Sequence, residues 1–352
     1  MSFALDPNPV MVRELRSTLR APAFPRVLYL STGLVAAVEL LAALVLAQDR
    51  ASPAEVGRWL FQTYFTAAYA LVALVSSVYG AGAISRDAES GALEAISLAS
   101  ASPWRFVRGK LAALCAITGT LLVASLPAAA VPLLYGGVSP WEIVFGTVAL
   151  GLVALVGISL GLAISARTST PRWSLVLTVA VCVPSAAISL LGITALGDLA
   201  RHSWGVRFDG PFWFVSALAA GVDGQRGVML LVLPIFTIAS ALWYLVGGAV
   251  GPLQPPSEDR LRVYRRWLPG TLGLVAAGVA IARPTLGAVD AFVLEIIALM
   301  AGLGVGIVAV ITLAGGARAG SSRGPGVTAA MTLLVLSAAA GLCLIALAPS
   351  VV

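Results

Sequence analysis

Charged side chains are scarce in this chain. Aspartate, glutamate, lysine and arginine make up 11% of its 352 residues, whereas a soluble globular protein has about 25%. Hydrophobic residues make up 59%, and the mean hydropathy is +0.97. This composition excludes an ordinary soluble domain and predicts an all-α, polytopic integral membrane protein.

Histidine and cysteine are also rare, with one histidine and three cysteines. The cysteines each lie inside a separate apolar run, so we expect neither a disulfide framework nor a metal site. Gly157–Gly161 matches the G-x-S-x-G nucleophile pattern. It lies within a predicted span, however, while His202 falls in an outer loop, so we interpret the match as chance.

A phosphate-binding loop is missing as well. Gly109-Lys110 has neither a glycine five residues before it nor a serine or threonine after it. Without a nucleotide-binding or catalytic motif, the chain is not expected to be an enzyme or to bind a cofactor. If ATP powers it, a separate subunit must bind the nucleotide and its magnesium.

Apolar runs dominate what is present. Nine are long enough to span a bilayer or nearly so, and most reach the roughly 20 residues required. They lie near residues 27–47, 59–84, 106–134, 141–165, 173–197, 228–250, 267–282, 288–314 and 327–349. A polar, proline-rich break follows Gly251. We therefore predict an N-terminal segment over 1–26, a six-span core over 27–251 and a three-span extension over 252–352.

Basic residues cluster in the connections between runs. With the N-terminus inside, sixteen of them fall on the inner side and six on the outer side. Basic residues accumulate on the cytoplasmic side of membrane proteins. This distribution predicts a cytoplasmic N-terminus in a plasma (inner) membrane, and it argues against nucleic acid as a partner.

The N-terminal segment predicts an amphipathic helix. Asn8 can cap a helix that has Pro9 at its first position. Apolar residues then share one face and arginines the other, so the helix would lie against lipid headgroups. A solvated basic tail is the alternative. The residues concerned are Met11, Val12, Arg13, Glu14, Leu15, Arg16, Leu19 and Arg20.

The most highly charged stretch runs from Ser85 to Lys110, between two apolar runs. Its alanines at 88, 92, 95 and 99 form one stripe at helical spacing. The pattern predicts a short amphipathic helix over about 86–100, ended by Ser102-Pro103. An ordinary charged loop is the alternative.

This stretch resembles the first cytoplasmic loop of ABC transporter permeases of the type-2, exporter-like family. Glu89, Gly91, Leu93 and Glu94 match its Glu-x-Gly-x-Leu-Glu core, and Gly109-Lys110 match a later Gly-Lys. Ala92 replaces the usual threonine, and Ser100 stands where a proline is common. Asn8-Pro9-Val10 and Arg13-Glu14-Leu15-Arg16 resemble the opening of many such permeases.

The resemblance implies a fold and partners. The N-terminal helix would be an elbow leading into the first span, and Asp87–Ile96 a coupling helix docked in a cytoplasmic ABC ATPase. A second permease subunit, identical or related, would complete the transporter, with an extracytoplasmic accessory protein as a further possible partner. The implied ATPase-coupling residues are Arg86, Asp87, Glu89, Gly91, Leu93, Glu94 and Ile96.

Two further features concern the spans. Residues 198–227 form the longest outer connection, and their apolar part, 210–221, is too short to span, which predicts a re-entrant or interfacial segment. Glu39 and Glu295 are acidic residues inside spans, toward the outer ends of the first and eighth. Such a residue costs about 2.5–3.5 kcal/mol at the bilayer centre, so each has either a structural or an ion-binding role.

Three functions remain open from the sequence. The resemblance favours the permease subunit of an ABC exporter, of unknown substrate. An ATP-driven scaffold that acts on an extracytoplasmic partner without moving a solute is the second. An ion-coupled secondary transporter is the third, and the small number of acidic residues within the spans weighs against it.

Overall fold

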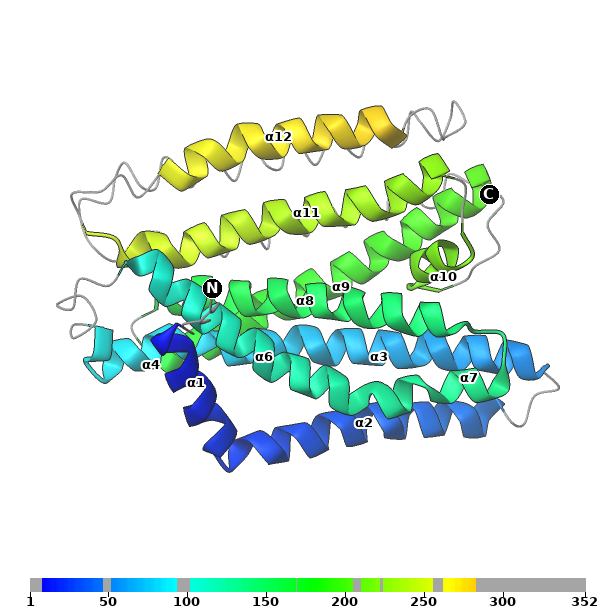
Figure 1. The fold of residues 1–352 in the computed structure, drawn as a ribbon, viewed down its shortest axis with the longest axis horizontal. Helices are drawn as coiled ribbons and strands as arrows, with labels where there is room; N and C mark the ends of the chain where they lie inside the picture. The colour runs from blue at the N-terminus through cyan, green and yellow to red at the C-terminus, as the bar shows by residue number, and fades with distance from the viewer. Residues whose placement is uncertain are drawn as a thin grey trace, which may run out of the picture.

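The computed structural model describes residues 8–46, 52–93, 102–168, 170–204, 210–221, 224–255 and 262–282. Within these ranges the chain forms helices and no strand. Figure 1 shows long helices lying side by side, with α1 (Pro9–Arg20) set at an angle across one end of the bundle. We call this the elbow end, and the opposite end the far end.

Six helices are long and apolar enough to cross a membrane. They correspond to the six predicted core spans, which confirms a multi-pass, all-α membrane protein. The helices are α2 (Ala23–Leu46), α3 (Pro53–Ala81), α6 (Pro103–Ala129), α8 (Pro140–Ser165), α9 (Pro171–Trp204) and α11 (Gly224–Val250). The predicted eighth and ninth runs, with Glu295, lie outside the described residues.

The central helix is α3. In the most apolar stretch of its span, 61% is buried inside the bundle, whereas the corresponding share for α2 is 17%. It packs closely on α8 through glycines. A Cβ added at Gly161 would come within 2.2 Å of the Ser77 carbonyl oxygen, and one at Gly80 within 2.5 Å of the Ile158 carbonyl oxygen. Only glycine lets two backbones approach so closely.

The far end is closed by short helices, α7 (Val131–Tyr135) and α10 (Trp213–Ala219). The predicted re-entrant segment 198–227 is divided, because α9 continues to Trp204 and α11 begins at Gly224. The apolar part forms α10, whose Trp213 indole donates to the Ile193 carbonyl oxygen at 2.8 Å. Phe212 and Trp213 are buried against the bundle.

The seventh apolar run forms part of α12 (Arg262–Ala282), which follows the short 3-10 helix Gly251–Leu253. Trp267 is buried, and its indole donates to the Ser240 carbonyl oxygen of α11 at 3.0 Å. The Tyr264 hydroxyl accepts from Arg167 at 2.7 Å. α12 therefore packs against α11 and against Arg167, at the end of α8.

The predicted coupling helix over 86–100 is wrong as one continuous helix. Gly82 breaks the span, α4 runs over Ala83–Glu89, and a turn at Ser90-Gly91 ends it. Gly91 has φ +74°, a conformation that favours glycine. Residues 92 and 93 begin another helical segment. Ala88 and Ala92 therefore do not share one helical stripe, and the part of the stripe at 95 and 99 lies outside the described residues.

Candidate functional site: a charged junction at the elbow end

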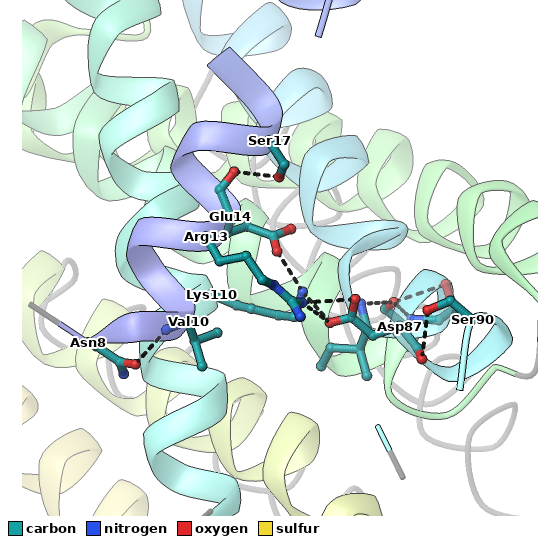
Figure 2. Close-up of polar contacts among 11 residues, drawn as sticks. Asn8, Val10, Arg13, Glu14, Ser17, Asp87, Ser90 and Lys110 are labelled. Atoms are coloured by element: carbon teal, nitrogen blue, oxygen red, sulfur yellow. Dashed lines mark hydrogen bonds and ion pairs between the residues drawn. The ribbon is translucent and has the colours of Figure 1, made fainter. Parts of the chain in front are cut away.

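Four charged side chains from three helices meet at the elbow end (Figure 2). They are Arg13 and Glu14 of α1, Asp87 of α4 and Lys110 of α6. We call this group the charged junction. It contains two cations and two anions, so its formal charge is zero.

Lys110 is the centre of the junction. Its side chain is 0% exposed, and its Nζ lies 2.8 Å from Asp87 Oδ2 and 3.0 Å from Glu14 Oε2. The Phe106 ring lies beneath it, with its centroid 5.3 Å from Nζ. A buried ammonium without partners is strongly unfavourable, so the two carboxylates and the ring compensate for the lost water.

Arg13 completes the junction from the outside. Its Nη2 lies 3.2 Å from both carboxylate oxygens of Asp87, and its side chain is 52% exposed, against 15% for Asp87. Asp87 thus bridges a buried cation and a surface cation. An exposed ion pair such as Arg13–Asp87 contributes little to stability by itself. In the buried pairs of Lys110, removing one partner would leave the other charge buried without compensation.

Gly109 explains how α1 reaches Lys110. A Cβ at this position would lie 2.7 Å from Asn8 Nδ2 and 3.0 Å from Val10 Cβ. Its absence lets the first turn of α1 lie directly on α6. Asn8 caps α1 by accepting from the Val10 amide at 3.1 Å, as predicted, and its Nδ2 donates to the Arg105 carbonyl oxygen at 2.7 Å. The Gly-Lys pair therefore has two separate tasks, close approach and charge pairing.

The start of α4, the helix that carries Asp87, is held in place by α8. α4 restarts the helix at Ala83, so its first amides lack partners within the helix. The Ser165 hydroxyl oxygen accepts from the amides of Ile84 at 3.0 Å and Ser85 at 2.9 Å. One buried oxygen thereby fixes the direction of α4 relative to α8. At the other end of α4, the Ser90 hydroxyl donates to the Asp87 carbonyl oxygen at 3.2 Å (Figure 2).

An apolar cluster lies under the junction. Ile84, Phe106, Val107 and Leu162 are buried in it, and Val10 and Leu15 of α1 pack against it. Leu93 also packs against this cluster. Its side chain is therefore half-buried within the chain itself, although the resemblance implied a contact with a partner.

The predicted site residues separate into groups. The structure brings Arg13, Glu14 and Asp87 together, and it leaves Arg86, Glu89 and Gly91 exposed beside them. Arg16 and Leu19 are exposed on α1. Glu39 is buried elsewhere in the bundle, and Glu94 and Ile96 lie outside the described residues.

The sequence does not predict Lys110 to be a site residue; it marks Lys110 only as part of the Gly-Lys match. A signal was present, because Lys110 falls inside the apolar run 106–134, and a cation in such a run needs an anionic partner. Only the fold shows that the anionic partners of Lys110 are Glu14 and Asp87.

In the described part of the chain, no group of three or more His, Cys, Asp or Glu side chains is placed to hold a metal ion. The sequence matches no protein-family model and no curated protein.

Proposed function

We propose that this chain is the membrane-spanning permease subunit of an ABC transporter and works as an exporter. The observation that carries the proposal is the charged junction, which links α1, α4 and α6 directly beside an exposed charged turn at Glu89–Gly91. The resemblance in the motifs at 89–94 and 109–110 supplies the partner, a cytoplasmic ATPase that binds ATP and magnesium.

A turn in this position is suited to transmit force. It follows α4, which continues from the central helix α3 after the break at Gly82. A displacement of the turn moves Asp87 and, through its ion pairs, Lys110 of α6 and Arg13 of α1. Packed contacts of this kind carry displacement between elements. The exposed side chains of Arg86 and Glu89 are available to an ATPase surface.

The proposal also includes an orientation in the membrane and a second subunit. The elbow end faces the cytoplasm of a prokaryotic cell, as the distribution of basic residues favours. α1 lies at the inner surface of the plasma membrane, where exposed Arg16 contacts lipid headgroups. A second permease subunit, identical or related, completes the transporter.

The test is recovery and crosslinking of the ATPase. The full-length chain is purified in mild detergent from its native host, and a Glu89→Cys variant is crosslinked through its thiol. We expect an ABC ATPase to co-purify and to crosslink at position 89. A cysteine at Asp198, exposed at the far end, is the matched control and should not crosslink to it.

Charge reversal provides the quantitative test. Arg86→Glu together with Glu89→Lys should reduce the retained ATPase severalfold at physiological salt, because peripheral charges govern association rate and salt dependence. Asp198→Lys should retain it. Absence of any ATPase in mild detergent at low salt would overturn the proposal. ATP hydrolysis without solute movement in sealed vesicles would favour the scaffold alternative instead.

A further inference from the structure

The peripheral helix α2 has one buried face. Most of its side chains are exposed, including Leu40 and Leu44. The buried residues of α2 are Ser31, Val35 and Glu39, each four residues from the next. This spacing places them on one stripe of the helix, and α2 packs against α3 and α6. Glu39 therefore points into the bundle rather than toward lipid.

Glu39 has no partner in this position. It is 4% exposed, and its Oε1 makes no hydrogen bond. No ion pair to it exists among the described residues. Val35, one turn before it on the same face, belongs to the apolar core cluster with Phe61 and Leu122. A buried polar atom without a partner is rare and requires a physical explanation.

Tyr64 of α3 is a titratable group close enough for the charge of Glu39 to act on it. Its hydroxyl, however, donates toward Ser125 of α6, with 3.1 Å to the carbonyl oxygen and 3.0 Å to Oγ. The charged residues of α1 lie at the other end of α2, roughly 24 Å away at 1.5 Å per residue.

A cavity of about 20 Å³ lies between α2, α3 and α6; Glu39 does not line it, but Val35, one turn away on α2, does. Such a volume holds about one water molecule. Val35 and Ser31 line it, one and two turns before Glu39 on the same face, and Ser125 lines it from α6. The hydroxyl groups of Ser31 and Thr118 donate to their own helices, which leaves their oxygens free to accept from a water.

The charge state of Glu39 follows from these surroundings. An ionised carboxylate without a cation or hydrogen-bond donor is strongly disfavoured in an apolar interior, and the group takes up a proton instead. We propose that Glu39 is a proton-binding site within the membrane. The packed helices hold it as the neutral acid, and a water in the cavity one turn away on the same face accepts the proton when it is released. The site is independent of the proposed transport function.

Carbodiimides of different solubility test this site. A membrane-soluble carbodiimide reacts with a protonated, buried carboxyl and remains attached as an N-acylurea, which mass spectrometry locates. In the full-length protein in membranes, we expect it to label Glu39 more strongly than Glu55, which is exposed at the start of α3. A water-soluble carbodiimide with an added amine should reverse this order. Labelling of Glu39 should fall as the pH rises and the acid ionises.

A substitution provides the second measurement. Glutamine has the shape of the neutral acid, so Glu39→Gln should abolish the adduct, leave the thermal stability at acidic pH unchanged and raise it near neutral pH. The wild-type protein should lose stability as the pH rises, because the folded state holds a proton that the unfolded chain releases. Glu39→Gln should lose less. A folded wild-type protein that shows no adduct at Glu39 at any pH, or a marked drop in stability in Glu39→Gln, would overturn the proposal.

Discussion

At the elbow end the carboxylates of Glu14 and Asp87 bind cations on other helices, whereas at the far end those of Glu55 and Glu142 bind within their own helix. Each of the latter accepts from the backbone amide three residues before it, at 2.8 Å for Ser52 and 2.6 Å for Ser139. These are capping boxes, which stabilise a single helix start. The same chemical group therefore joins helices at one end and completes helices at the other.

This difference has a mechanical meaning. A capping box is formed and lost with its own helix, so it transmits nothing to neighbouring helices. The charged junction relates three helices through one buried ammonium, so none of them moves without changing its pairing. We expect perturbations at the elbow end to be coupled and those at the far end to remain local.

The largest expected effect comes from Lys110→Met. It leaves Glu14 and Asp87 without the buried cation and should destabilise the protein by about 3–5 kcal/mol. The free energy of unfolding of the full-length protein in mixed detergent measures this. Adding Glu14→Gln to Lys110→Met should recover part of the loss, because an unpaired charge disappears. A purely additive double variant would contradict the coupling at this end.

The next effect concerns close packing. Gly109→Val would place side-chain atoms where Asn8 and Val10 now lie, and such overpacking costs about 1–3 kcal/mol. Gly119→Ala is the matched control on the same helix, since nothing lies within 4 Å of the added Cβ. That control should be neutral or stabilising by up to about 1 kcal/mol. Equal effects of both changes would show that α1 does not depend on its contact with Gly109.

At the far end, Ser139→Ala removes one capping box. The expected loss is about 1 kcal/mol, the typical cost of a lost N-cap. Combined with Lys110→Met, the two losses should add to within about 0.5 kcal/mol, because the sites are at opposite ends. A larger deviation would mean that the two ends communicate through the bundle.

The smallest effect is expected for Arg13→Ala. Half of the Arg13 side chain is exposed, and such pairs contribute about 0.2–1 kcal/mol. The loss should shrink further at high salt, which screens exposed charges. An Arg13 contribution as large as that of Lys110 would show that the junction does not depend on burial.

Much of the fold was predictable because it follows local rules. The six core spans and the Asn8 cap were found from apolar runs and from cap chemistry. α9 was predicted to end near 197, yet it continues to Trp204. Asp198 and Arg201 pair three residues apart on it, which is favourable in a helix but invisible to a hydropathy boundary.

The site was predictable only in part. The sequence marks Gly91 as a motif position, but the motif does not reveal that its left-handed backbone follows the end of α4. The alanine stripe suggested a continuous helix because periodicity alone ignores this break. An apolar run indicates that a helix is buried, but it does not indicate which side chains surround a given residue. The sequence alone therefore does not identify Lys110 as a site residue.

The contact between α3 and α8 has a consequence for sequence variation. A side chain at Gly80, Gly157 or Gly161 would meet backbone or hydroxyl atoms within 2.5 Å, so selection can accept almost nothing else there. The exposed leucines of α2 are interchangeable with other apolar residues. Under random mutagenesis with selection for the folded protein, substitutions should therefore accumulate along α2 and be purged from three glycines that bear no side chain at all.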